Sequence, residues 1–181
     1  EIATLPTGHD IPVALAVGDD GRFYVGGDQS VRILSPAGET LAAIDVSGPP
    51  RALAVGDGVL FVGMSRHVEV IDLDSGEVRA VWADLAEKAM ITSIAVGEED
   101  VYVADAGQRI VWRFDREGSL QQRIGERNER SGERGFVIPS PYFDVALGHD
   151  GTPWVVDPGR HTLVNYGLDG RRRSEWGKAS M

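Results

Sequence analysis

Short apolar segments, separated by turns rich in glycine, recur along this chain at a regular spacing. Four of them share one pattern, a small residue or Asp followed by apolar, Ala, apolar and Gly, and they occupy 14–18, 52–56, 93–97 and 144–148. Their start positions lie 38, 41 and 51 residues apart. Repeats of roughly 40 residues built from short strands are typical of β-propeller blades. The pattern therefore predicts four blades.

Each repeat continues with three further strands that are divided by turns. Asp-Gly pairs at 20–21 and 169–170 favour the positive φ angle of tight hairpins. Helix is scarce: only the amphipathic stretch 84–90, with Asp84 as its cap, is expected to form one or two turns. The predicted strands are 14–17, 22–25, 31–34 and 40–44; 52–55, 60–62, 68–72 and 78–82; 93–96, 101–104, 110–115 and 120–124; and 144–147, 152–156, 163–168 and 172–176.

The predicted fold class is therefore all-β, a propeller of four-stranded antiparallel blades. The chain divides into an N-terminal outer strand and loop at 1–10, then blades at 11–49, 50–91, 92–142 (with a long connecting loop) and 143–181. The outer strand, at 2–5, is surplus, because each blade already has four strands. Since a blade buries its faces only against its neighbours, we expect an incomplete ring whose partner is another polypeptide, either the remaining blades or a homo-oligomer mate. The alternative is a true four-bladed ring with a frayed N-terminus.

Composition narrows the range of functions. The 181-residue chain has a formal net charge of −10, which argues against nucleic acid and anionic membranes as partners. It has no cysteine, so disulfides and thiolate sites are excluded. No apolar segment approaches the roughly 20 residues that span a bilayer. The chain begins with Glu1, and removal of a signal peptide is one explanation, so we expect a soluble protein that is a candidate for export or a periplasmic location.

Two of the repeats carry a resemblance to a known family. Residues 103–118 and 156–170 resemble the core line of the NHL-repeat family, and 138–146 resembles the proline-led entry into its first strand. The first two repeats match less well. They have Gly26-Gly27-Asp28 and Gly63-Met64-Ser65 where the other two have Ala104-Asp105 and Val156-Asp157. The resemblance implies an NHL-type propeller, usually of six blades, of which two would need ~80 further residues. Such propellers include binding proteins, lyases and hydrolases.

The loops at one face of a propeller surround the channel mouth, where ligands usually bind. In this chain they are 27–30, 65–67, 105–109 and 157–162 between the second and third strands of each blade, and 47–51, 84–91 and 126–142 between blades. The alternating Glu and Arg residues at 126–134 are expected to form a solvated, self-paired surface. The ligand-face candidates are His67, Arg109, Arg130, Tyr142, Arg160 and His161.

Two aspartates, Asp105 and Asp157, recur at the end of the second strand of their blades. We expect each carboxylate to accept backbone N–H bonds within its own turn, since a ligand role rarely repeats once per blade. The alternative makes them metal ligands. No cofactor is evident from the sequence, although the resemblance leaves open a divalent metal in the central channel. His67 and His161 are the candidate ligands, and the remaining ligands would lie outside this chain.

No glycine-rich phosphate loop, serine elbow or zinc-protease pattern is present, and no catalytic residue is assigned. The favoured function is an NHL-type scaffold for ligand or protein binding that works within a larger propeller or complex. The alternative is the N-terminal part of a metal-assisted propeller enzyme, a lyase or hydrolase, with its site at the channel mouth.

Overall fold

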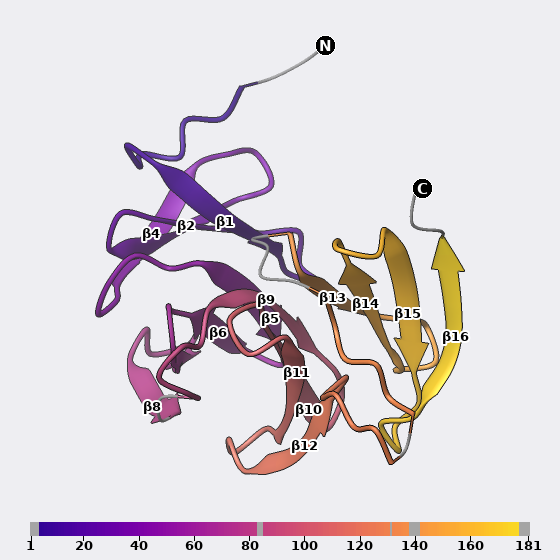
Figure 1. Ribbon diagram of the computed structural model, residues 1–181. Helices are drawn as coiled ribbons and strands as arrows, with labels where there is room; N and C mark the ends of the chain where they lie inside the picture. The colour runs from indigo at the N-terminus through magenta and orange to yellow at the C-terminus, as the bar shows by residue number, and fades with distance from the viewer. Residues whose placement is uncertain (1–3, 83–84, 131, 138–141, 178–181) are drawn as a thin grey trace. The chain divides into compact units, whose positions relative to one another are not determined.

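The structure, a computed structural model, describes residues 4–82, 85–130, 132–137 and 142–177, and these residues form sixteen β-strands (Figure 1). The strands make four antiparallel four-stranded sheets, and within each sheet the strands follow the order of the sequence. This confirms the predicted propeller blades. Every strand lies within two residues of its predicted position. No helix that could span a membrane is found among the described residues.

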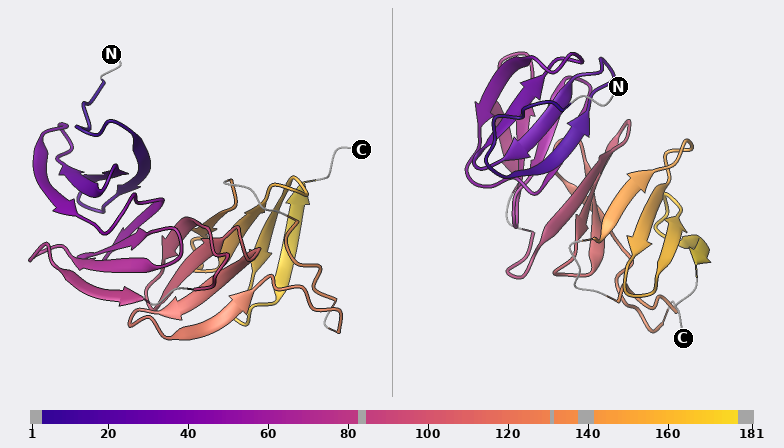
Figure 2. Two further views of the ribbon diagram at one scale, coloured as in Figure 1. Left: turned by 60° about the vertical axis from the view of Figure 1, so that its left-hand side comes forward. Right: turned by 90° about the horizontal axis from the view of Figure 1, so that it is seen from above.

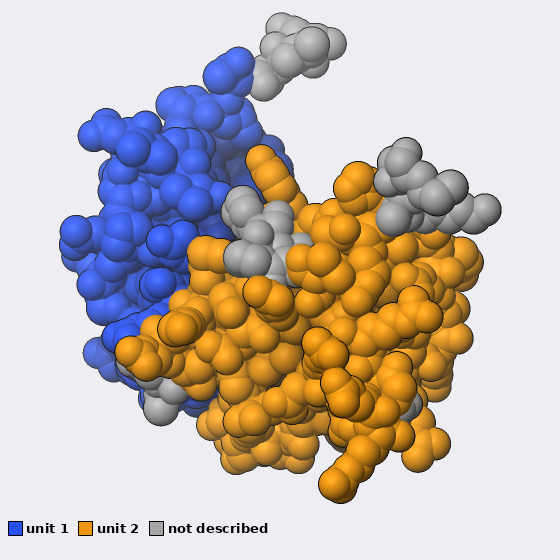
Figure 3. Space-filling view, in the orientation of Figure 1, with its two compact units in different colours: residues 1–83 blue, residues 84–181 orange. Residues whose placement is uncertain are grey.

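The four sheets follow one another along the chain. The first contains β1 (Pro12–Val17), β2 (Phe23–Gly27), β3 (Ser30–Leu34) and β4 (Thr40–Asp45), and the second contains β5 (Ala52–Gly56), β6 (Val59–Gly63), β7 (Val68–Asp72) and β8 (Val78–Trp82). The third contains β9 (Ile91–Val96), β10 (Asp100–Asp105), β11 (Ile110–Asp115) and β12 (Leu120–Ile124), and the fourth contains β13 (Asp144–Leu147), β14 (Pro153–Asp157), β15 (Thr162–Tyr166) and β16 (Arg172–Gly177). The sheets divide into two compact units, residues 1–83 and 84–181 (Figure 3).

In the first unit, alternation along β1 determines which side chains enter the core. Ala14 and Ala16 pack against a buried cluster that includes Leu53 of β5. Successive side chains of a strand point to opposite faces, so Leu15 and Val17 lie on the other side of the sheet, where both are more than half exposed. One face of the first blade is thus buried and the other is open.

The second unit has the same construction. Tyr102 and Val111 of the third sheet form one buried cluster with Val155 and Tyr166 of the fourth, and Figure 2 shows these two sheets stacked face to face. Phe136, from the long connection between the sheets, fills the same core and packs edge-on against Tyr166 at 5.9 Å between ring centroids. Core packing of Phe136 therefore fixes the position of part of this connection, whose described residues have no regular secondary structure.

Two local predictions turn out differently. The described part of 84–90 contains no helix, but a single turn in which the Ala89 N–H donates to the Ala86 carbonyl at 3.1 Å. A hydrogen bond from the Met90 N–H to Asp105 holds this segment against the third sheet, so the segment does not form a helix. Of the outer strand expected at 2–5, Thr4 and Leu5 have irregular backbone, while residues 2–3 and Asp84 lie outside the described residues.

Candidate functional site

Asp105 fixes the turn between β10 and β11. Its side chain is fully buried, and its Oδ1 accepts hydrogen bonds from the N–H groups of Met90 at 2.8 Å and Gln108 at 3.1 Å. Its Oδ2 accepts a bond from the Trp112 indole Nε1 at 3.0 Å. Gly107 in the same turn lies against the incoming segment so closely that a Cβ there would fall 1.8 Å from the Lys88 carbonyl oxygen. The β10–β11 turn is therefore packed closely against the connection that leads into β9 and is hydrogen-bonded to it.

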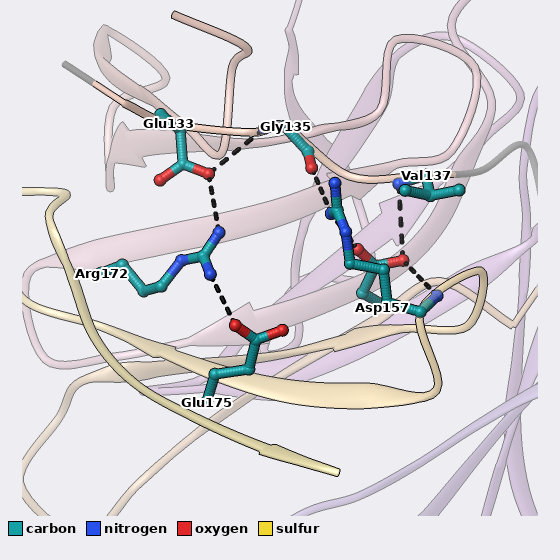
Figure 4. A network of polar contacts seen from close by, with 7 residues as sticks. Glu133, Gly135, Val137, Asp157, Arg172 and Glu175 are labelled. Atoms are coloured by element: carbon teal, nitrogen blue, oxygen red, sulfur yellow. Dashed lines mark hydrogen bonds and ion pairs between the residues drawn. The ribbon is translucent and has the colours of Figure 1, made fainter. Parts of the chain in front are cut away.

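Asp157 has the equivalent place in the fourth sheet. It is also fully buried, and its Oδ1 accepts bonds from the N–H groups of Val137 at 3.4 Å and Arg160 at 3.3 Å (Figure 4). Its Oδ2 lies 2.7 Å from Nη1 of Arg160, which also donates to the carbonyl oxygen of Gly135. One carboxylate and one guanidinium thus attach the β14–β15 turn to the long connection.

In the first unit, two other carboxylates accept hydrogen bonds from the backbone of the incoming connection. Asp28 accepts bonds from the N–H groups of Asp10 and Ile11, and the Asp10 bond is the main cause that lowers the pKa of the Asp28 carboxyl. Glu69 of β7 accepts one from the N–H of Ser47 at 3.2 Å. In every blade, then, a carboxylate holds the incoming connection by its backbone N–H. The sequence did not predict this role for Asp28 and Glu69, because neither is the last residue of the second strand, as Asp105 and Asp157 are.

His9 is also structural. Its ring is buried, Nε2 lies 2.9 Å from the Val25 carbonyl oxygen, and Nδ1 lies 3.4 Å from Asp28 Oδ2. The ring rests on Gly27, where a Cβ would approach it to 2.8 Å. These contacts place His9 in the packing of the first blade, with its two nitrogens directed at protein groups.

His67 lies beside a hydroxyl and a carboxylate. Its Nε2 is 3.4 Å from Ser47 Oγ and 3.5 Å from Glu69 Oε1, while Glu69 Oε2 is buried without a hydrogen bond to a described residue. A relay that activates a serine needs the hydroxyl on one ring nitrogen and the carboxylate on the other. Here both contacts fall on the same nitrogen, so the trio does not have the geometry of a catalytic triad.

Arg109 and His161 occupy matching places in their turns, four residues after Asp105 and Asp157. Both have left-handed backbone, with φ angles of 61° and 56°. Such angles are uncommon outside glycine, so each turn imposes a specific shape at this position. Both side chains are exposed, and they project from backbone that the buried aspartate holds in place.

The long connection between the third and fourth sheets is anchored by a second network (Figure 4). Arg172 of β16 lies 3.3 Å from Glu133 and 2.6 Å from Glu175. Burial by itself lowers the pKa of the Arg172 guanidinium, but the Glu133 carboxylate raises it, and the net shift is upward. The ion pair of Glu133 with Arg172 therefore joins the long connection to β16. The self-paired surface expected here holds for Arg127 and Glu129, which lie 3.0 Å apart.

A cavity of about 640 Å³ lies between these anchored segments in the second unit. Arg109 and Arg160, two of the ligand-face candidates, both border it, and the long connection supplies Arg134 to its wall. The cavity is lined by the backbone turns of two blades and by the connection between them. Its residues therefore come from parts of the sequence as far apart as Leu85 and Arg160.

The other ligand-face candidates lie elsewhere. His161, Arg130 and Tyr142 are exposed and do not border this cavity, and His67 belongs to the first unit. Among the described residues, no group of three His, Cys, Asp or Glu side chains could hold a metal ion.

Comparison with solved structures identifies proteins of the same fold. Streptogramin B lyase superposes with a TM-score of 0.70 at 15% identity, over 92% of this chain and 54% of that chain. A catalytically inactive virginiamycin B lyase from Staphylococcus aureus with quinupristin gives 0.72 at 15% identity, over 98% of this chain and 59% of that chain. Another virginiamycin B lyase from S. aureus, substituted with selenomethionine, gives 0.69 at 14% identity, over 90% and 54%.

These similarities show the fold, a β-propeller, and the chain spans little more than half the length of the propellers it resembles. No family model matches the chain. No curated protein sequence matches it either.

Proposed function

We propose that this chain is an NHL-type propeller scaffold that works as part of a larger propeller or complex. The observation that carries the proposal is an open blade face in each unit, formed by apolar side chains where a neighbouring blade would pack. Propeller blades are stable only when both faces are covered. The partner is therefore a set of further blades, supplied by the same polypeptide or by another.

In the second unit the open face is a row of side chains across the fourth sheet. Val156 lies opposite Leu163, and Leu163 lies opposite Trp176, in the register of β14, β15 and β16. All three are more than a third exposed, and Trp176 is 55% exposed. The Trp176 ring stacks on Trp154 at 4.5 Å with an interplanar angle of 9°. The row is apolar, as a surface that receives another blade should be.

The first unit has a corresponding face on β1. Val13, Leu15 and Val17 alternate along the strand, and each is between 55 and 62% exposed. Their neighbours Ala14 and Ala16 are turned toward the core. Solved propellers similar to this chain are almost twice its length, and the additional residues are enough to form further blades.

The test is the association state of the 181-residue chain, measured by size-exclusion chromatography with light scattering over a concentration series. We expect association that rises with concentration, because exposed apolar faces pair with each other when their partner is missing. A double variant, Leu163→Ser with Trp176→Ser, should weaken it.

The matched control is Leu168→Ser, which removes a leucine that is 49% exposed but follows β15 in a turn, outside the row. It should leave association unchanged. A chain that stays a monodisperse monomer throughout the series would contradict the proposal. So would an equal loss of association in Leu168→Ser.

The similar lyases support a second candidate, the metal-assisted propeller enzyme, with His67 and His161 as its metal ligands. No group of three His, Cys, Asp or Glu side chains forms among the described residues, so in this candidate the remaining ligands come from outside this chain. The candidate is tested by mass-spectrometric measurement of quinupristin consumption with and without added Zn²⁺, a divalent ion that histidine commonly binds. Consumption that depends on the metal and is lost in His67→Ala and His161→Ala would establish it.

A further inference from the structure

Five of the fourteen residues that border the cavity of the second unit are arginines, although the chain as a whole is acidic. It has 28 acidic and 18 basic residues, yet this one cavity is bordered by five arginines and a single carboxylate, Glu126. The arginines come from two blade turns, one strand and the long connection, and they are Arg109, Arg123, Arg127, Arg134 and Arg160. Segments that meet in this way concentrate positive charge at one place.

Three of the five arginines have protein partners. Arg160 is held by Asp157 and Gly135, Arg127 by Glu129, and Arg123 lies 4.9 Å from the ring centroid of Trp112. For Arg160, both of these hydrogen bonds come from Nη1. The guanidinium is therefore fixed in place while its Nη2 donors remain for a ligand.

The other two arginines have no such partner. Arg109 and Arg134 are exposed, and neither side chain makes an ion pair or hydrogen bond with any described residue. Arg109 nevertheless stands on a rigid turn, since its own N–H donates to the Asp105 carbonyl at 2.8 Å. Two unpaired guanidinium groups at the edge of a cavity are suited to bind an anion from solution, because their planar donors match carboxylate and phosphate oxygens.

The floor of the cavity is apolar. Ile110, Trp112 and Phe136 border it and are buried. A volume of about 640 Å³ falls within the usual range for small-molecule sites, which combine an apolar lining with a few placed polar groups. The cavity therefore fits a ligand that has an anionic group and an apolar body.

We infer that this cavity binds a small organic anion, a phosphate or carboxylate attached to an aromatic or other apolar group. Arg109 and Arg134 contact the anionic oxygens, with Arg160 as the fixed third donor, and the body of the ligand lies on the apolar floor. This binding is independent of the open blade faces, whose residues do not border the cavity.

Isothermal titration of the whole chain at low ionic strength tests the inference with three probes. Phenyl phosphate and benzoate carry the two anionic groups on the same ring, and benzyl alcohol is the neutral equivalent. We expect at least one anion to bind at a single site and benzyl alcohol to bind much more weakly. The anion that binds more tightly distinguishes a phosphate site from a carboxylate site.

Substitutions show whether the binding uses the proposed residues. Arg109→Gln and Arg134→Gln should each weaken binding by about tenfold, the value of one charge-assisted hydrogen bond. Both side chains are exposed, so the variants should fold normally, which circular dichroism verifies. Arg116→Gln is the matched control, because it makes the same charge change at the opposite end of β11.

Three results would overturn the inference. The first is that neither anion binds. The second is that benzyl alcohol binds as tightly as the anions, which would indicate an apolar pocket. The third is that Arg116→Gln weakens binding as much as Arg109→Gln, which would indicate attraction by overall charge.

Discussion

Replacement of Asp105 by alanine tests whether a buried carboxylate holds each blade to its incoming connection. The substitution removes three hydrogen bonds at once, those from the N–H groups of Met90 and Gln108 and from the Trp112 indole. Asp105 is fully buried and Trp112 nearly so, and water can reach the Gln108 N–H more easily because that residue is exposed. The cost therefore depends mainly on Met90 and Trp112.

The magnitude follows from the donors that are left without a partner. A buried donor without an acceptor costs about 1–3 kcal/mol, and the Trp112 Nε1–H becomes such a donor, while the N–H of the half-buried Met90 adds a smaller cost. Because relaxation recovers part of this, we expect Asp105→Ala to lower the free energy of unfolding by about 2–4 kcal/mol. Asp105→Asn keeps an acceptor for the two backbone groups but presents an amide to the Trp112 N–H, so its loss should be smaller.

Urea unfolding, followed by tryptophan fluorescence and circular dichroism, measures this loss. Glu117→Ala is the control, since this exposed carboxylate lies in the same blade and should change stability by no more than about 0.5 kcal/mol. Amide hydrogen exchange gives a local measurement, because the Met90 N–H should exchange faster in Asp105→Ala. A loss no greater than that of Glu117→Ala, with unchanged exchange at Met90, would refute the reasoning.

Two further predictions concern the turns. The Ser119 N–H is the main cause that lowers the pKa of the Asp115 carboxyl, so its contribution to stability should be present above about pH 5 and lost as pH falls through the lowered pKa. Urea unfolding across an acidic pH series should show this dependence, and Asp115→Asn should flatten it. Gly107→Ala should reduce the thermal midpoint, measured by circular dichroism, because the added Cβ would collide with the Lys88 carbonyl oxygen. An unchanged midpoint would contradict close packing between Gly107 and Lys88.

The sequence predicted the sheets well because the information for them is local. Each blade is a series of hairpins between consecutive strands, and each strand is an apolar segment that ends at a turn. Asp105 and Asp157 could be identified for the same reason, since each directly ends a strand. Asp28 and Glu69 bind backbone N–H groups in the same way from other positions, so a search for a repeated motif does not find them.

The cavity could be predicted only in part. Arg109 and Arg160 stand in turns that the sequence placed at one face, but their approach to Arg134 depends on the path of the long connection. That path is set by Phe136 in the core, by Gly135 beside Arg160 and by the ion pair of Glu133 with Arg172. None of these contacts has a periodic signal, because they join an irregular segment to distant strands.

In the repeated turn, one residue stabilises the fold and a different residue is available to contact a ligand. The buried aspartate fixes the backbone, while the exposed residue four positions later is Arg109 in one blade and His161 in the next. Since both residues accept the same left-handed backbone, exchange of one for the other should leave folding almost unchanged. Arg109→His should then bind an anionic probe weakly at pH 8, where histidine is neutral, and more tightly below about pH 6, where it is charged. Titration calorimetry at the two pH values measures this change, and equal affinity at both would show that position 109 does not contact the anion.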